Sequence, residues 1–436
     1  MLIFFSFIRI SLFLLLIIVY SNASTNVQLI KKENKGSDTT LLVIGGIHGD
    51  EPGGYFSPAI LATHYKITSN NLWIVPNLNK DSIQANQRGI NGDMNRKFFT
   101  ISKEDKDSKI VQEIKDIILS KEVSLIINLH DGHGFYRTKD EGSIFNPNAW
   151  GQTCVIDQCN LPKNQKFSDL NAIALAVQKN LNQNLLQNHH MFNIRNTNTK
   201  FDDEDMKLSL TYFAVTNDKP AFAIETSKNL TSLSKKVFYQ LLAIEEFMKI
   251  MNIGYKRDFD LNEETIKPML QEYDTLVINN NISLQLNDIK KRLTYIPLNS
   301  ENKFEFSSPL GSVKSTKDGY KVYIGNKNVT TLEPQHFQMA EDCKQNFSVI
   351  IDNKLVSIDN SSELFVNNSF NVVQQKNIRV NVIGYSSSQN KVNESGIDIS
   401  LKDLNSKFSI DNQNKIYRLE FYKDDKFCSM STVHFK

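Results

Sequence analysis

The sequence predicts an α/β domain with a mixed sheet flanked by helices, followed by two small all-β, sandwich-like domains. Between about residues 39 and 252, short apolar runs of strand length alternate with segments of helical periodicity, an order typical of α/β folds. After about residue 256, turns rich in Asn, Ser, Thr and Lys separate short alternating stretches, and helical periodicity nearly disappears. A chain of 436 residues is long enough for two or three domains of ordinary size.

Four near-continuous apolar runs are expected to form strands that are covered on both faces. These runs lie at residues 39–46, 72–77, 123–130 and 220–226. Between them, apolar residues recur at helical spacing over residues 110–118 and again over residues 237–251. The sheet of the first domain is therefore expected to be largely parallel or mixed.

The remainder of the chain is interpreted as two β domains, residues 257–343 and 344–436, that meet near residue 343. A possible helix over residues 261–272 is the exception to the β pattern. The alternating stretches are "GYKVYIG" at 319–325, "FSVIID" at 347–352, "IRVNVIGY" at 378–385 and "IYRLEFYK" at 416–423. Such short strands between turns are typical of sandwich-like domains.

Residues 1–23 are interpreted as a secretory signal peptide. Arg9 precedes an apolar run of about a dozen residues, and small residues up to Ala23 supply a cleavage site. The first folded domain would then cover residues 24–256. An uncleaved membrane anchor is the alternative, and in either case the chain leaves the cytoplasm. The formal net charge of +2 gives no reason to expect a nucleic-acid partner.

Export places the four cysteines in a compartment where disulfides form. Their order along the chain suggests the pairs Cys154–Cys159 and Cys343–Cys428, each within one domain. Four unpaired, mostly buried thiols are the alternative. Because the sequence contains no C-x-x-C pair, a zinc ion held by cysteines is not expected.

The stretch "GGIHGDEPGG" places His48 and Glu51 where a buried strand ends and a helix is about to begin. A spacing of three residues lets both side chains point to one side of a tight turn. The run "LIINLHDGHG" ends another strand with His130, and His133 follows in a glycine-flanked loop. Because ligands of α/β sheets gather at the carboxyl ends of strands, His48, Glu51 and His130 are expected to form a zinc site with one open position.

Further polar residues follow two other predicted strands. Arg88, Asn95 and Arg96 lie within "VPNLNKDSIQANQRGINGDMNRKF", and the guanidinium groups could pair with a substrate carboxylate. Glu225 ends the run "PAFAIE" and is the candidate general base. Surface charges for both arginines and a strand-end cap for Glu225 are the structural alternatives.

The ordered motifs "HGDE", "R…GxDMNRKF", "LHDGHG" and "AIET" resemble those of the funnelin (carboxypeptidase A-like) superfamily of zinc carboxypeptidases. The resemblance implies a carboxypeptidase-like sheet and one zinc ion per chain, with His48, Glu51 and His130 as ligands. It also implies that Asn95 and Arg96 hold a substrate carboxylate. Arg88 would polarise the scissile carbonyl, and Glu225 would be the catalytic base.

The whole chain is similar to a narrower group, the exported peptidoglycan DL-carboxypeptidases that set helical cell shape in some Gram-negative bacteria. This resemblance implies a periplasmic enzyme that removes meso-diaminopimelate from the L-Ala-γ-D-Glu-mDAP tripeptide, leaving a dipeptide. It implies peptidoglycan muropeptides as partners, with cell-wall-shaping proteins as possible partners of the β domains. Some members replace the first zinc histidine with glutamine, whereas this chain keeps His48.

The substrate pocket is less well defined by the motifs. Trp150 and Tyr212 are candidates for the aromatic residue that covers the substrate in digestive carboxypeptidases, and Trp150 and Thr211 for pocket walls. The acidic stretch "FDDED", residues 201–205, offers negative charge for the distal amine of diaminopimelate, with a solvated acidic turn as the alternative.

Two other functions fit parts of the pattern. An acyl-amino-acid deacylase of the aspartoacylase and succinylglutamate desuccinylase type has a similar "GxHGxE" turn and Asn-Arg pair, but secretion and the added β domains argue against it. A non-catalytic wall-binding protein would not be expected to keep His48, Glu51, His130 and Glu225 together.

Overall fold

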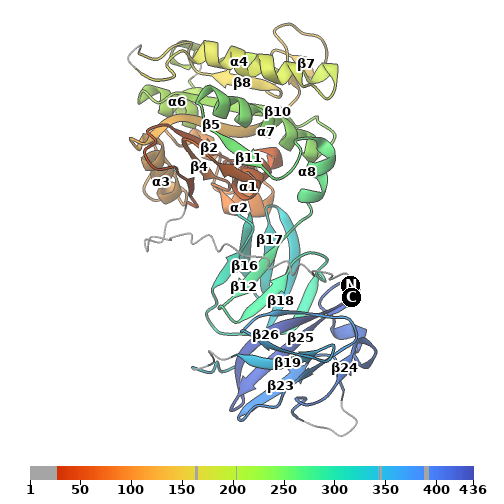
Figure 1. The fold of residues 1–436 in the computed structure, drawn as a ribbon. Coiled ribbons are helices and arrows are strands. Elements are labelled where there is room, and N and C mark those ends of the chain that lie inside the picture. The colour runs from red at the N-terminus through yellow and green to blue at the C-terminus, as the bar shows by residue number, and fades with distance from the viewer. Residues whose placement is uncertain (1–26, 163–164, 203, 342, 344–345, 387–391) are drawn as a thin grey trace, which may run out of the picture.

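The structure is a computed structural model that describes residues 27–162, 165–202, 204–341, 343, 346–386 and 392–436. The proposed signal peptide, residues 1–23, lies outside the described residues. Within the described part, no helix is both long and apolar enough to cross a membrane. Figure 1 shows a mixed sheet with its helices at one end of the molecule and β-sheets at the other.

A seven-stranded mixed sheet forms the first domain, and its four central strands are the four that the apolar runs predict. Its order is β1 (Ile30–Lys32), β4 (Asn71–Val75), β2 (Thr40–Ile44), β5 (Val123–Gly132), β10 (Ala221–Ser227), β8 (Thr153–Ile156) and β9 (Asn193–Asn196). The four central strands β4, β2, β5 and β10 are parallel to one another, whereas β1 and β8 are antiparallel to their neighbours β4 and β10. The carboxyl ends of four strands therefore meet at one edge of the sheet.

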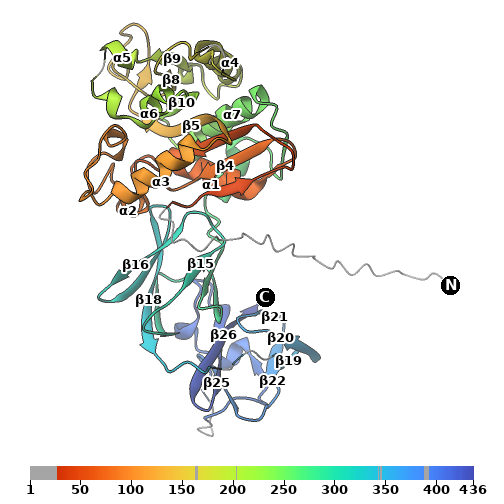
Figure 2. The same ribbon diagram turned by 90° about the vertical axis from the view of Figure 1, so that its left-hand side faces the viewer.

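Helices cover both faces of this sheet, which explains why β2 and β4 are buried at every position (Figures 1 and 2). On one face α1 (Pro52–His64), α4 (Leu170–Gln183) and α7 (Leu233–Ile250) pack together. On the other lie α3 (Ser108–Leu119) and α6 (Leu210–Thr216). The helical spacing at 110–118 and 237–251 is thus confirmed by α3 and α7.

Several short elements complete this domain and the segment that leads to the β-sheets. They are α2 (Lys80–Ala85), α5 (Thr199–Asp202), α8 (Glu263–Met269), the pair β3 (Tyr65–Ile67) and β11 (Tyr255–Arg257), and the pair β6 (Phe135–Tyr136) and β7 (Phe145–Asn146). Helix α8 confirms the helical segment expected within residues 261–272.

The rest of the described chain consists mainly of three β-sheets. The largest joins β15 (Phe304–Phe306), β12 (Thr275–Ile278), β13 (Ile282–Gln285), β26 (Lys426–Phe435), β25 (Ile416–Lys423) and β23 (Ile378–Val382), with β21 (Glu363–Val366) on β26. The others are β14 (Arg292–Leu298), β18 (Lys327–His336), β17 (Gly319–Ile324) and β16 (Gly311–Thr316), and β20 (Lys354–Ile358), β19 (Phe347–Ile351), β22 (Ser369–Val372) and β24 (Ile399–Ser400).

The largest β-sheet takes strands from both sides of residue 343, because β13 pairs with β26. One hydrophobic core runs from the first domain into the sheets nearest to it and includes Phe427 and Met430 of β26, while a second core lies within the C-terminal part. The division of the chain into domains at residues 256 and 343 stays a prediction.

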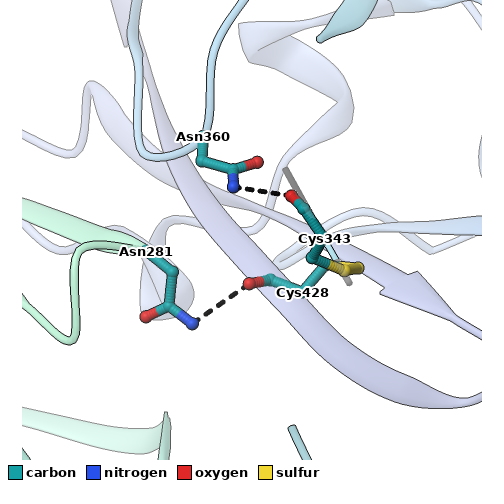
Figure 3. Close-up of a disulfide and its surroundings, with 4 residues drawn as sticks. All are labelled: Asn281, Cys343, Asn360 and Cys428. Carbon is teal, nitrogen blue, oxygen red and sulfur yellow. Dashed lines mark hydrogen bonds between the residues drawn. A yellow bond between two sulfur atoms is a disulfide. The ribbon is translucent and has the colours of Figure 1, made fainter. Parts of the chain in front are cut away.

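The cysteines follow the sequence prediction in one pair only. Cys343 and Cys428 form a disulfide, beside which Asn360 and Asn281 donate side-chain hydrogen bonds to the two cysteine carbonyls (Figure 3). The expected pair Cys154–Cys159 is wrong: both thiols are free.

The direction of strand β8 explains that error. Cys154 is buried within β8, whereas Cys159 is exposed beyond the strand's end. An extended strand advances about 3.3 Å per residue, while a disulfide needs Cα atoms within about 7 Å of each other. The strand therefore carries the chain away from Cys154 before Cys159 is reached.

Candidate active site

The candidate catalytic residues meet at the carboxyl ends of three parallel strands. His48 and Glu51 follow β2, His130 lies near the end of β5, and Glu225 lies near the end of β10. The register of β5 and β10 places Glu225 directly beside His130. Parallel pairing thus brings together residues that are almost 180 positions apart in the sequence.

Glycines let the loop after β2 approach its neighbours closely. Gly46 has a φ angle of +72°, which side-chain-bearing residues rarely adopt. A Cβ atom on Gly49 would lie 2.0 Å from the carbonyl oxygen of Ser82 in α2, so no larger residue fits there. Glu51 occupies the N-cap position of α1 without a side-chain capping bond, and Pro52 begins the helix with its favourable fixed φ. The turn is therefore built to hold His48 and Glu51 in place.

The side chains of His48, Glu51 and His130 form a buried cluster whose donor atoms all lie within 4.8 Å of one another. Nδ1 of His48 lies 2.9 Å from Oε1 of Glu51, and Nδ1 of His130 lies 2.8 Å from its Oε2. Two imidazoles and one carboxylate are a donor set that divalent transition metals accept. The residues fit a metal centre, and three protein ligands leave an open coordination position.

The other ring nitrogen of each histidine also has a polar partner. Nε2 of His48 lies 2.8 Å from Oδ1 of Asp93, the carboxylate contact that metal-binding imidazoles commonly make, whereas Nε2 of His130 accepts from the side-chain amide nitrogen of Asn128 at 2.7 Å. A proton shared with the Asp93 carboxylate leaves Nδ1 of His48 free to bind a metal. Sequence analysis missed both partners, although Asn128 shares a face of β5 with His130 and Asp93 lies within the "GDMNRKF" motif.

The base candidate Glu225 faces the same cluster. Burial and the negative charge of Glu51 raise the pKa of the Glu225 carboxyl well above its ordinary value. A carboxyl with a raised pKa is a better proton acceptor when ionised, which suits a general base. The strand-end cap considered for Glu225 is thus not needed to explain its position.

The cluster opens into a cleft of about 270 Å³. Its walls are His48, Glu51, Arg88, Asn95, Arg96, His130, Asp131, Gly132, His133, Trp150, Met206, Glu225 and Lys228. The predicted metal, base and carboxylate-binding residues therefore share one cleft. Asp131, Met206 and Lys228 were not expected there.

Arg88 contacts both Glu51 of the candidate metal site and Asp93, the residue that holds His48. Its Nη1 donates to Oε1 of Glu51 at 3.2 Å, and its Nε donates to Oδ2 of Asp93 at 2.9 Å. Asn95 accepts a hydrogen bond from the backbone N–H of Leu210, which orients its amide. These contacts place Arg88 at the site, and with 49% of its side chain exposed it is at the same time the surface charge of the alternative.

The expected pocket walls are only partly found at the cleft. Trp150 and His133 line it, and the backbone carbonyl of His133 accepts from Trp150 N–H at 2.9 Å. Thr211 and Tyr212 at the start of α6 are not among the cleft's lining residues; Thr211 is buried and Tyr212 packs against the core.

The acidic stretch 201–205 is likewise absent from the described walls, although the adjoining Met206 is among them. Within this stretch Asp203 lies outside the described residues. Glu204 forms an ion pair with Lys207, which partly neutralises the negative charge expected to attract the diaminopimelate amine.

Comparisons with known proteins agree with this geometry. Residues 1–271 match the Peptidase M99 family, described as the catalytic part of a carboxypeptidase controlling helical cell shape, and residues 340–436 match the C-terminal domain of metallo-carboxypeptidases. A comparison with curated proteins finds no match.

Solved structures of the cell shape determinant Csd4 from Helicobacter pylori resemble the whole described fold. The apo structure is 34% identical over 94% of this chain and 100% of that one, with a TM-score of 0.88. The tripeptide-bound structure gives the same values. The mDAP-bound form, described as a D,L-carboxypeptidase, is 35% identical over 93% of this chain and 100% of that one, with a TM-score of 0.88. The chain therefore belongs to the Peptidase M99 family of metallo-carboxypeptidases that control helical cell shape.

Proposed function

We propose that this chain is a zinc carboxypeptidase that releases meso-diaminopimelate from the peptidoglycan tripeptide L-Ala-γ-D-Glu-mDAP and leaves the dipeptide. The observation that carries the proposal is one cleft that joins a metal cluster, a buried glutamate and two arginines. The likeness to a tripeptide-bound Csd4 supports the choice of substrate.

The roles of the site residues follow from their positions. We propose that His48, Glu51 and His130 hold zinc, which supplies Lewis-acid chemistry for amide hydrolysis. Glu225 would take a proton from the attacking water and later return it to the leaving amine. Arg88 would donate to the scissile carbonyl oxygen as negative charge develops there.

Substrate binding is assigned to the cationic side of the cleft. A carboxypeptidase must bind the free carboxylate next to the scissile amide, and Asn95 with Arg96 offers an amide and a guanidinium at the cleft wall. Trp150 would cover the substrate side chain. Thr211, Tyr212 and the acidic stretch 201–205 stay candidates for contacts with the far end of diaminopimelate.

The location and domain roles complete the proposal. Residues 1–23 would direct the chain to the periplasm, where peptidoglycan lies, and residues 24–256 would form the catalytic domain. The β domains, proposed as 257–343 and 344–436, would bind other wall-shaping proteins.

Digestion of purified sacculi with the full chain, followed by mass spectrometry of the released muropeptides, tests the function. We expect tripeptides to become dipeptides with release of free diaminopimelate. An acyl-amino-acid deacylase would leave the tripeptides intact. Kinetics on tripeptides that end in meso-diaminopimelate or in L-lysine test the recognition of the distal zwitterion, because equal efficiency on both would contradict it.

A further inference from the structure

Trp150 is fixed through its backbone beside the metal cluster. Its N–H donates to the His133 carbonyl at 2.9 Å, and its own carbonyl accepts from the Thr153 hydroxyl at 2.6 Å. A Cβ atom on Gly132 would lie 2.6 Å from Cβ of Trp150, so the two segments pack without space between them. The backbone of Trp150 is thus tied to the loop after β5, but these contacts leave the indole free to rotate.

Arg195 on β9 fixes the indole itself. Its guanidinium carbon lies 3.8 Å from the centre of the Trp150 ring and 5.2 Å from that of Tyr136. Its Nη1 donates to the carbonyls of Ala149 at 2.8 Å and Pro147 at 3.1 Å. One side chain therefore stacks on the indole and bonds to the backbone that leads into it.

The stack adjoins the cleft wall. Among the described residues Trp150 lines the cleft and Arg195 does not, so the guanidinium contacts the indole without being part of the cleft wall. A planar, weakly hydrated guanidinium stacks well on an aromatic face, and an ammonium does so less completely. The arrangement supports the ring without adding a charge to the cleft.

We propose that Arg195 is a positioning residue that holds the Trp150 indole as a rigid wall for the substrate's diaminopimelate side chain. The inference rests on the proposed function, because that function supplies the substrate. A wall that contacts only the substrate side chain and not the reacting atoms touches ground state and transition state alike, so its loss raises KM and leaves kcat unchanged. A preformed wall also avoids the entropy cost of ordering a loose side chain.

Kinetics with the tripeptide test the substrate side of this proposal. We expect Arg195→Gln to raise KM about two- to tenfold with kcat unchanged, because substrate binding must then order the loosened indole. Arg195→Lys keeps the charge and should give a smaller rise. In a Trp150→Ala background, Arg195→Gln should have no further effect. Arg292→Gln, which removes an exposed guanidinium paired with Glu333 on a distant sheet, is the matched control and should change nothing.

Fluorescence tests the stack without any turnover. The chain has two tryptophans, and in a Trp73→Phe background Trp150 is the only emitter. We expect Arg195→Gln to shift its emission to longer wavelength and to increase quenching by acrylamide, because one ring face loses its cover. The same emission gives the affinity for meso-diaminopimelate, which should fall about two- to tenfold.

The outcomes separate the two proposals. If acrylamide quenching is unchanged in Arg195→Gln, then Arg195 does not cover the Trp150 indole, whatever the activity of the variant. Increased quenching with unchanged KM and unchanged diaminopimelate affinity would overturn the positioning role. A parent chain that neither cleaves the tripeptide nor binds diaminopimelate would contradict the proposed function. The quenching measurement would still test the contact between Arg195 and Trp150.

Discussion

Replacing Asp93 by asparagine should weaken metal binding although no ligand is touched. Oδ1 of Asp93 lies 2.8 Å from Nε2 of His48, and Oδ2 accepts from Nε of Arg88 at 2.9 Å. Burial alone would raise the pKa of Asp93, but hydrogen bonding and charge from His48 and then Arg88 hold it well below its usual range. The carboxylate is therefore ionised at neutral pH and accepts from three N–H groups, because the backbone N–H of Asn95 also donates to Oδ1 at 2.9 Å.

An asparagine at this position has only one oxygen for these three donors. If that oxygen accepts from the His48 ring, its NH₂ group faces the Arg88 N–H, and the reverse orientation leaves the ring without an acceptor. The imidazole also loses the adjacent negative charge that raises its basicity. Outer partners of this kind are worth about 10–100-fold in metal affinity, which corresponds to about 1.4–2.7 kcal/mol.

Competition between the full chain and a zinc chelator measures this affinity. We expect Asp93→Asn to release zinc at a chelator concentration about 10–100-fold lower than the parent requires. The control is Asp81→Asn, which removes an exposed carboxylate at the start of α2. The loss of zinc affinity expected for an outer partner is about 10–100-fold. If Asp93→Asn binds zinc within about twofold of the parent, this role for Asp93 is refuted.

Three further predictions follow from the site and the fold. Glu225→Gln should keep its zinc and lose about 10²–10⁴-fold in kcat, because no group then accepts the proton of the attacking water. Kinetics of tripeptide cleavage measure this loss. His130→Ala should lose zinc by elemental analysis, whereas His133→Ala should keep it. Cys343→Ser removes the disulfide and should lower the free energy of unfolding by about 2–4 kcal/mol in denaturant titration, whereas Cys159→Ser alters an exposed free thiol and should not.

The sequence predicts the sheet and the cleft well because both depend on local patterns. Apolar runs such as residues 123–130 become strands buried on both faces, and parallel order then forces their polar ends to one edge. His48, His130 and Glu225 could be brought together by this rule alone. Asp93 could not, because its contact with His48 depends on the path of a loop that has no period.

Pairing between distant strands was beyond sequence reasoning for a related reason. Alternation predicts individual strands such as residues 416–423, but it does not show which strands lie side by side, as β13 and β26 do across more than 140 residues. The pair Cys154–Cys159 was inferred from nearness in sequence, and an extended strand makes near residues distant in space. Local patterns therefore identify elements more reliably than they identify partners.

The loop that holds the metal ligands is itself supported by the segment after β4. Leu78 N–H donates to the Gly45 carbonyl at 3.0 Å, and Gly49 N–H donates to the Gln87 carbonyl at 3.0 Å. Helix α2 thus lies directly against the turn that carries His48. Any shift of α2 would move that turn as well, because Gly49 has no space to move independently.

The other side of this segment rests on the β-sheet of β14, β18, β17 and β16. The Asn77 amide donates to the Pro309 carbonyl at 2.7 Å, and the Gln84 amide donates to the Ser312 hydroxyl at 2.8 Å. The first of these bonds is buried, so breaking it would leave a carbonyl without a partner, at a cost of about 1–3 kcal/mol. The segment that carries Arg88 is therefore held between the turn of His48 and Glu51 on one side and the β-rich part of the chain on the other. The β-rich part thus helps to position the residues of the active site.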